Sequence, residues 1–158
     1  MTKQLPVEVF MPPNPLKAKV GGGAAGLDAS ALERAEQALA SLSIEFDAWI
    51  ASDVQQLSRL RDVFAARPDE AGRNGLYRAS LDLKGHARTF EFPLVERVAA
   101  SLCHLLGSPA PTLQLVDAHV GAIRVIVREN IRDPSDHMAS TLAAELETRV
   151  GEFLCPQS

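Results

Sequence analysis

The chain is poor in aromatic residues, in cysteine and in long apolar runs. Aromatic residues are 5% of its 158 residues while Ala and Leu dominate, a mixture that favours helix over sheet. Its two cysteines, Cys103 and Cys155, stand in no CxxC or metal-finger spacing, so we expect two reduced thiols. No apolar run approaches the roughly 20 residues that span a bilayer, and MTKQLPVEVF at the start lacks the apolar stretch of a signal peptide. We therefore expect a cytoplasmic protein without a membrane span.

An excess of basic residues is also missing. The net charge is −4 and the basic residues are scattered, which argues against a nucleic-acid surface. The length favours one domain, which we expect over residues 28–158. An irregular segment, residues 1–27, is predicted before it. There, MPPNPLKAKVGGGAAG combines prolines, which remove backbone donors, with glycines, which add chain entropy, so a stable helix is not expected.

From residue 30 onward, apolar residues recur at helical spacing. Ser30 and Glu33 form a capping box that predicts the start of a first helix, and SLS at 41–43 is expected to break or bend that helix. Helices are predicted at about 30–42, 46–67, 69–89, from 93 up to GSPAP, 112–131 and 136–154. Amphipathic helices joined by short loops favour an all-α, up-and-down four-helix bundle, here with an extra N-terminal helix and a C-terminal helix.

One leucine lies on the polar side of the helix predicted at 69–89. Leu81 is about 200° from the core residue Leu83 around the helix, so the two point in nearly opposite directions. A single exposed leucine is ordinary, but Gly85 follows one turn later on the same face. A glycine inside a helix costs about 1 kcal/mol relative to alanine, and its bare backbone lets another molecule approach. Together with flanking basic residues, these features predict a docking site. Its predicted partner-binding residues are Tyr77, Leu81, Lys84, Gly85 and Arg88.

The stretch LDLKGHARTFEFPLVERVAASL resembles the motif of histidine-containing phosphotransfer (HPt) domains, the four-helix bundles of bacterial phosphorelays. Their active helix reads His-x-Leu-Lys-Gly, with a second glycine about half a dozen residues later. The resemblance covers about residues 30–131. It implies that the histidine exchanges a phosphoryl group with the aspartate of a receiver domain. It also implies that the lysine assists the phosphohistidine electrostatically and that the glycine makes room for the receiver.

Two positions of this chain depart from that motif. Leu83, Lys84 and Gly85 match it, but Leu81 occupies the phosphoacceptor position and Glu91 the position of the second glycine. Leucine has no nucleophilic atom and cannot accept a phosphoryl group. We therefore predict a pseudo-HPt protein, not an enzyme and without a cofactor, that binds a receiver domain or a histidine kinase and modulates a phosphorelay without carrying phosphate. A monomer is expected, although an apolar surface left by the helices could pair two copies.

Two other functions stay open from the sequence. His86 is the fallback phosphoacceptor, five residues after Leu81 and about 140° around the helix, where we expect it to contact Asp82. Alternatively, a helical-bundle adaptor could act through another surface, such as the N-terminal segment or the last helix. No metal site is expected, because its ligands would have to converge from three helices. The residues considered for such a site are Cys103, His104, His119 and Cys155.

Overall fold

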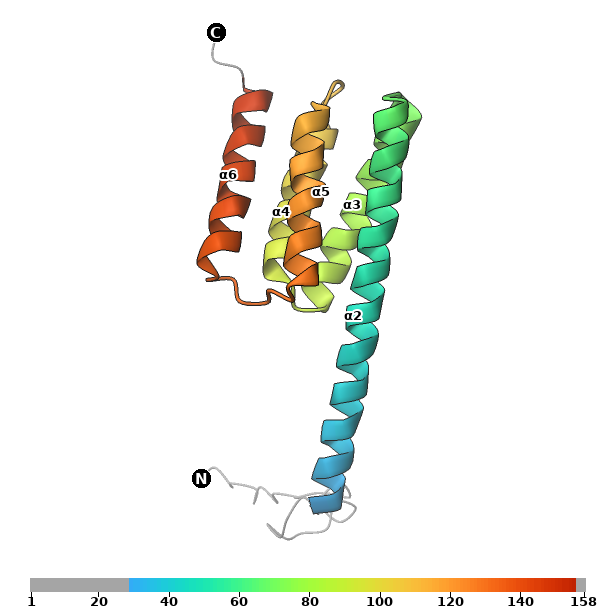
Figure 1. Ribbon diagram of the computed structural model, residues 1–158, viewed down its shortest axis with the longest axis vertical. Helices are drawn as coiled ribbons and strands as arrows, with labels where there is room; N and C mark the ends of the chain where they lie inside the picture. Colours follow the sequence, from blue (N-terminus) through green and yellow to red (C-terminus); the bar gives the residue numbers. More distant parts are fainter. Residues whose placement is uncertain (1–28, 156–158) are drawn as a thin grey trace, which may run out of the picture. The chain divides into compact units, whose positions relative to one another are not determined.

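The computed structural model describes residues 29–155, which form five α-helices and no strand (Figure 1). This part of the chain is therefore all-α, as the composition predicts. None of its helices is both long and apolar enough to cross a membrane. The irregular segment predicted at 1–27 lies outside the described residues. The helices are α2 (Ala29–Ala66), α3 (Glu70–Thr89), α4 (Pro93–Leu106), α5 (Leu113–Arg128) and α6 (His137–Leu154).

Helix α2 is one continuous helix where the sequence predicted two. Serine costs at most about 0.7 kcal/mol inside a helix, and α2 contains neither proline nor glycine, so the SLS stretch does not break it. The predicted extra N-terminal helix is thus the first part of α2, and Ser30 lies inside the helix, not at its cap. The helix ends at Ala66 because Pro68 disfavours a helical conformation at Arg67.

The chain divides into two compact units, residues 1–39 and 40–158, and the division falls inside α2. In the first unit the described residues, 29–39, all belong to α2, and none of them is buried. The second unit contains the rest of α2 and helices α3 to α6. It holds the hydrophobic core.

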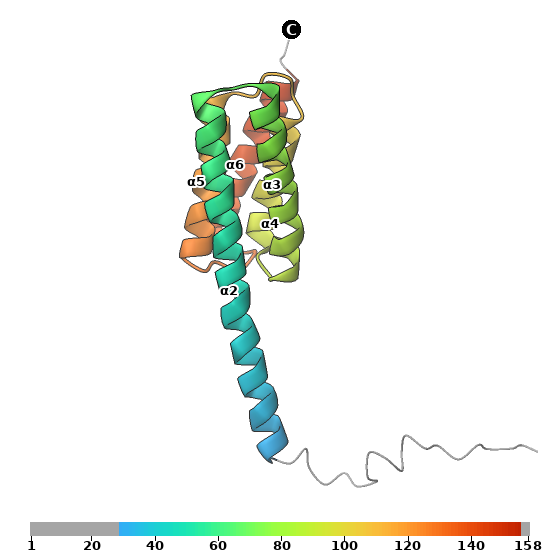
Figure 2. The same ribbon diagram turned by 90° about the vertical axis from the view of Figure 1, so that its right-hand side faces the viewer.

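Helix α4 lies at the centre of the second unit. It packs against α3, α5 and α6, and α5 also packs against α6 (Figure 1; Figure 2). Nine of its residues are buried, which fits a helix with neighbours on several sides. The C-terminal part of α2 adds Ile50, Leu57 and Phe64 to the same core. An ion pair of 2.6 Å between Arg61 and Asp117 joins α2 to α5.

The buried face of α6 agrees only in part with the spacing of its large apolar residues, which predicts one face with Met138, Leu142, Leu146, Val150 and Phe153. Leu146 and Val150 are buried as predicted, whereas Met138 and Leu142 are 81% and 38% exposed. Ala139 and Ala143 are buried instead. Both sets of residues satisfy helical spacing, so periodicity alone could not choose between them. An offset of one residue turns the buried face by about 100°.

Candidate functional site

The outer face of α3 carries a row of residues spaced by four, three and four positions. Tyr77 and Leu81 are 37% and 46% exposed, Arg88 is exposed, and Lys84 is half-buried. A helix brings residues at these spacings onto one side. Gly85 lies beside them, also exposed, and a Cβ added to it would meet no atom within 4 Å. The structure therefore gathers the five predicted partner-binding residues on one open surface, which we call the α3 face.

The α3 face is cationic around its apolar centre. Neither the side chain of Lys84 nor that of Arg88 forms a hydrogen bond or an ion pair with any residue between 29 and 155. Lys84 lies near Cys103 of α4, where burial raises the pKa of the thiol and the lysine charge opposes that shift. In contrast, Arg73 on the same helix donates to the carbonyl oxygen of Ser108. The two cations are thus free to meet an anionic partner, which suits a docking surface.

Helix α3 ends in a turn that holds Glu91 in a left-handed conformation, with a φ of 60°. The amide of Phe92 donates to the carbonyl oxygen of Ala87 at 2.8 Å, and the amide of Phe90 donates to that of His86. The first of these bonds closes a Schellman motif, in which the residue at positive φ is usually glycine. The resemblance described above would place the second glycine of the HPt motif at Glu91. The turn therefore requires a left-handed backbone conformation, which glycine adopts most easily, and in this chain a glutamate adopts it.

His86 pairs with Asp53 of α2 and not with Asp82 as expected. Its Nδ1 lies 2.6 Å from Oδ2 of Asp53, and its ring centroid lies 5.9 Å from that of Phe90. Figure 2 shows α3 running beside the C-terminal part of α2, which brings these two side chains together. The sequence carried no local signal for this pair, because 33 positions separate its members. The contact turns the histidine toward α2 and leaves its Nε2 free for chemistry.

The remaining histidines and cysteines lie apart. His119 is buried between α4 and α5, where Nδ1 donates to the carbonyl oxygen of Leu115 and Nε2 lies 2.9 Å from the hydroxyl of Ser101. Burial lowers the pKa of His119. His104 is exposed on α4, and of the two free thiols Cys103 is buried and Cys155 exposed. Within residues 29–155 no three His, Cys, Asp or Glu side chains gather in a way that could hold a metal ion.

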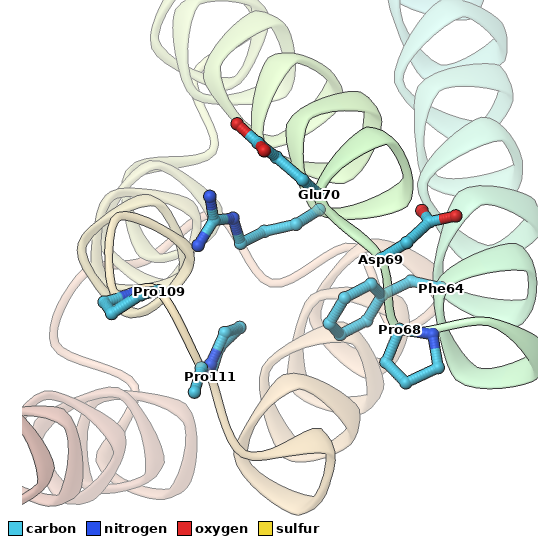
Figure 3. A pocket seen from close by; sticks show the side chains of 8 residues that line it. Phe64, Pro68, Asp69, Glu70, Pro109 and Pro111 are labelled. Carbon is cyan, nitrogen blue, oxygen red and sulfur yellow. The ribbon is translucent and has the colours of Figure 1, made fainter.

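A hollow of about 440 Å³ lies at the other end of α3 (Figure 3). Its polar groups already serve the fold. Asp69 accepts from the amide of Gly72 at 2.8 Å and caps α3, and Arg67 donates to the same carboxylate. Arg73 is engaged with Ser108, so the hollow offers a ligand few free polar groups. Its lining residues are Phe64, Pro68, Asp69, Glu70, Arg73, Pro109, Ala110 and Pro111.

Comparison of this chain with known protein families, with curated proteins and with solved structures found no match.

Proposed function

We propose that this protein is a pseudo-HPt module of the bacterial cytoplasm that docks on a receiver domain or a histidine kinase and modulates a phosphorelay without carrying phosphate. In this proposal α3 is the helix that corresponds to the active helix of the family. The part of α2 from Ala40 onward, α4 and α5 complete a four-helix bundle. Helix α6 is an additional helix packed on α4 and α5.

The observation that carries the proposal is an exposed leucine surrounded by the elements of a docking site. Leu81 is 46% exposed at the centre of the α3 face, with Gly85 open beside it. A leucine in that place does nothing for the core, whereas an apolar side chain inserted into a partner can dominate an interface. The left-handed backbone at Glu91 adds support, because it occurs where the family motif has a glycine.

The charges of the α3 face indicate what it would contact. A receiver domain that exchanges phosphoryl groups through an aspartate presents an anionic site. Lys84 and Arg88 have no internal partner among residues 29–155 and would complement such a site. Opposite charges across an interface accelerate association and select the orientation of the partner. The apolar Leu81 would fill the space that a reactive imidazole fills in an active HPt domain, so the complex would form without phosphoryl transfer.

Binding to a panel of receiver domains, each with and without phosphorylation by a small phosphodonor, tests the proposal. Calorimetry or interferometry would measure the dissociation constants. We expect one receiver to bind and Leu81→Asp to weaken that complex by roughly 30-fold or more, the effect of losing a hot spot of about 2 kcal/mol. Gly85→Arg is expected to abolish binding while leaving the fold intact, because no atom lies within 4 Å of an added Cβ.

Leu142→Asp is the matched control for Leu81→Asp. Leu142 is an exposed leucine on α6, so the same chemical change is made on a different surface, and binding should stay unchanged. Circular dichroism and melting curves would verify that all variants fold. If Leu81→Asp and Gly85→Arg both bound the receiver as tightly as the unmodified chain, the α3 face would not be the docking site.

The pair between His86 and Asp53 favours one second candidate, an active phosphotransferase. A carboxylate that holds Nδ1 of a histidine fixes the tautomer and leaves Nε2 as a nucleophile. In this case Nε2 would attack the acyl phosphate of a receiver, forming a P–N bond as the bond to the aspartate oxygen breaks. The His86 side chain is 53% exposed, so a donor could reach it.

Intact-mass spectrometry at neutral pH separates the two candidates. After incubation with phosphorylated receivers, the second candidate predicts an acid-labile gain of one phosphoryl group that is absent in His86→Ala and reduced in Asp53→Asn. The pseudo-HPt proposal predicts no gain in any variant, together with a receiver complex that His86→Ala preserves. A phosphoryl gain that depends on His86 would overturn the pseudo-HPt proposal.

A further inference from the structure

The first half of α2 carries an apolar stripe that the described residues leave mostly exposed, with Phe46 alone partly buried, against Phe90. From residue 29 to residue 45 no side chain is buried, although leucine recurs along the helix. The stripe depends only on the helical geometry of α2, because all its members belong to that one helix. Its members are Leu32, Ala35, Leu39, Leu42, Phe46 and Trp49.

The spacing of this stripe is that of a coiled coil. Its six members are separated by three, four, three, four and three positions, which is the heptad pattern of a and d residues. Leu39 is 67% exposed, Leu42 44% and Trp49 54%, while Phe46 is half-covered by stacking on Phe90. Most of the stability of a helix in a protein comes from packing of its apolar face, and this part of α2 has no buried face among the described residues. We therefore expect a partner helix to pack on this stripe.

We propose that the partner is a second copy of this chain, and that the two α2 helices pair antiparallel around a twofold axis between Ala40 and Ser41. This axis matches the sizes of the side chains that would face each other. Trp49, the largest side chain, would face Leu32 of the partner subunit, and Phe46 would face the partner's Ala35. At the centre, Leu39 would face the partner's Leu42. Large side chains thus meet smaller ones in the outer layers and leucines meet at the centre, as a packed core requires.

A parallel pair would pack much less well. Each residue would then face its own copy, so Ala35 would leave a void while Phe46 and Trp49 would each crowd against an identical ring. The flanks also suit the antiparallel pair. Glu36 would lie near the partner's Ser43 and Glu45 near the partner's Ala38, so no like charges meet across the seam. A twofold axis makes the stripe complementary to itself, which is the usual basis of a dimer.

This inference departs from the monomer expected from the resemblance, and it is independent of the α3 face. Sedimentation velocity of the full chain between about 1 and 100 μM measures the association and detects dissociation constants in the micromolar range. We expect a dimer that Leu39→Asp and Leu42→Asp each convert to a monomer. The matched control is Ile44→Asp. Ile44 is 71% exposed on the same helix but stands outside the heptad pattern, so that variant should stay dimeric.

Spin labels measure the orientation of the pair. In a Cys155→Ser background, where the remaining thiol Cys103 is buried, labels at Glu33→Cys and Ser41→Cys report distances across the axis. The antiparallel pair predicts a short distance at position 41 and one roughly 20 Å longer along the axis at position 33, from a rise of about 1.5 Å per residue. Equal distances at both positions would contradict the antiparallel pair. A monomer at 100 μM, or a dimer broken by Ile44→Asp but not by Leu42→Asp, would overturn the proposal.

Discussion

The two faces of α3 each carry a leucine, one buried and one exposed. Leu83 is fully buried, whereas Leu81, only two residues earlier, is 46% exposed. The inner face is held by the core and contributes to the stability of the fold. The outer face adds little to stability, and its open glycine lowers it. The difference teaches that folding accounts for one side of this helix only, so the composition of the other side needs a functional explanation.

The largest expected effect is the contrast between the two leucines in stability. Leu83→Ala should lower the free energy of unfolding by about 2–5 kcal/mol, because it removes buried methyl groups and leaves a cavity. Leu81→Ala should change it by less than about 0.5 kcal/mol, as exposed substitutions usually do. Denaturation by urea, monitored by circular dichroism, measures both. Similar losses in the two variants would mean that Leu81 packs against something in solution.

The buried histidine His119 extends the comparison to pH. His119 is buried, and its pKa lies below the ordinary value because burial disfavours the charged form. The unfolded chain therefore binds a proton at higher pH than the folded chain does. The free energy of unfolding should therefore be at its full value above a pH of about 6.5 and should fall as the pH drops below that value. Urea denaturation at a series of pH values measures the slope.

His119→Gln tests the assignment of that slope. The variant removes the buried imidazole, so the loss of stability between pH 6.5 and 5 should become smaller. An unchanged slope in His119→Gln would contradict the assignment to His119.

Replacing a glycine of α3 should have a smaller effect than Leu83→Ala and one of opposite sign, a gain in the free energy of unfolding. Gly85→Ala should raise the free energy of unfolding by about 1 kcal/mol, because a helix interior favours alanine and nothing lies within 4 Å of the new Cβ. Gly72→Ala is the control. Its Cβ would meet the Asp69 carboxylate at 3.3 Å and the Arg67 carbonyl at 3.4 Å, so a smaller gain or a loss is expected. Thermal melts of both variants decide whether Gly85 is retained at a cost to the fold.

The helix boundaries were predicted well where the sequence has residues that strongly favour the start of a helix. Pro93 at the first turn of α4 and Asp69 before α3 fixed helix starts, and the structure confirms both. The break at Ser41–Ser43 was wrong because serine alone is too weak to stop a helix. The buried face of α6 was predicted only in part, because two rows of residues fit the same period: Leu146 and Val150 are buried as predicted, but Ala139 and Ala143 are buried in place of Met138 and Leu142. Local patterns thus predict where helices lie better than which side they bury.

The site was predictable along α3 and not across helices. The residues of the α3 face follow from spacing within one helix, and the structure exposes Tyr77, Leu81 and Gly85 on it. The pair of His86 with Asp53 joins two helices, so it depends on packing that no local pattern contains. The unburied stripe of α2 is visible in the sequence as a heptad spacing, but only the exposures distinguish it from a core face.

The smallest expected effect concerns the turn that ends the α3 face. Glu91 and Asn130 both have positive φ, 60° and 51°, and both follow the C-cap residue of a helix. Asparagine tolerates this conformation better than glutamate does, because its short side chain bonds locally. Glu91→Gly should therefore raise the free energy of unfolding by about 0.5 kcal/mol, and Asn130→Gly should change it by less. Melting temperatures of the two variants, measured side by side, test this ranking. A larger gain in stability for Asn130→Gly than for Glu91→Gly would show that contacts of the Glu91 side chain stabilise its left-handed conformation.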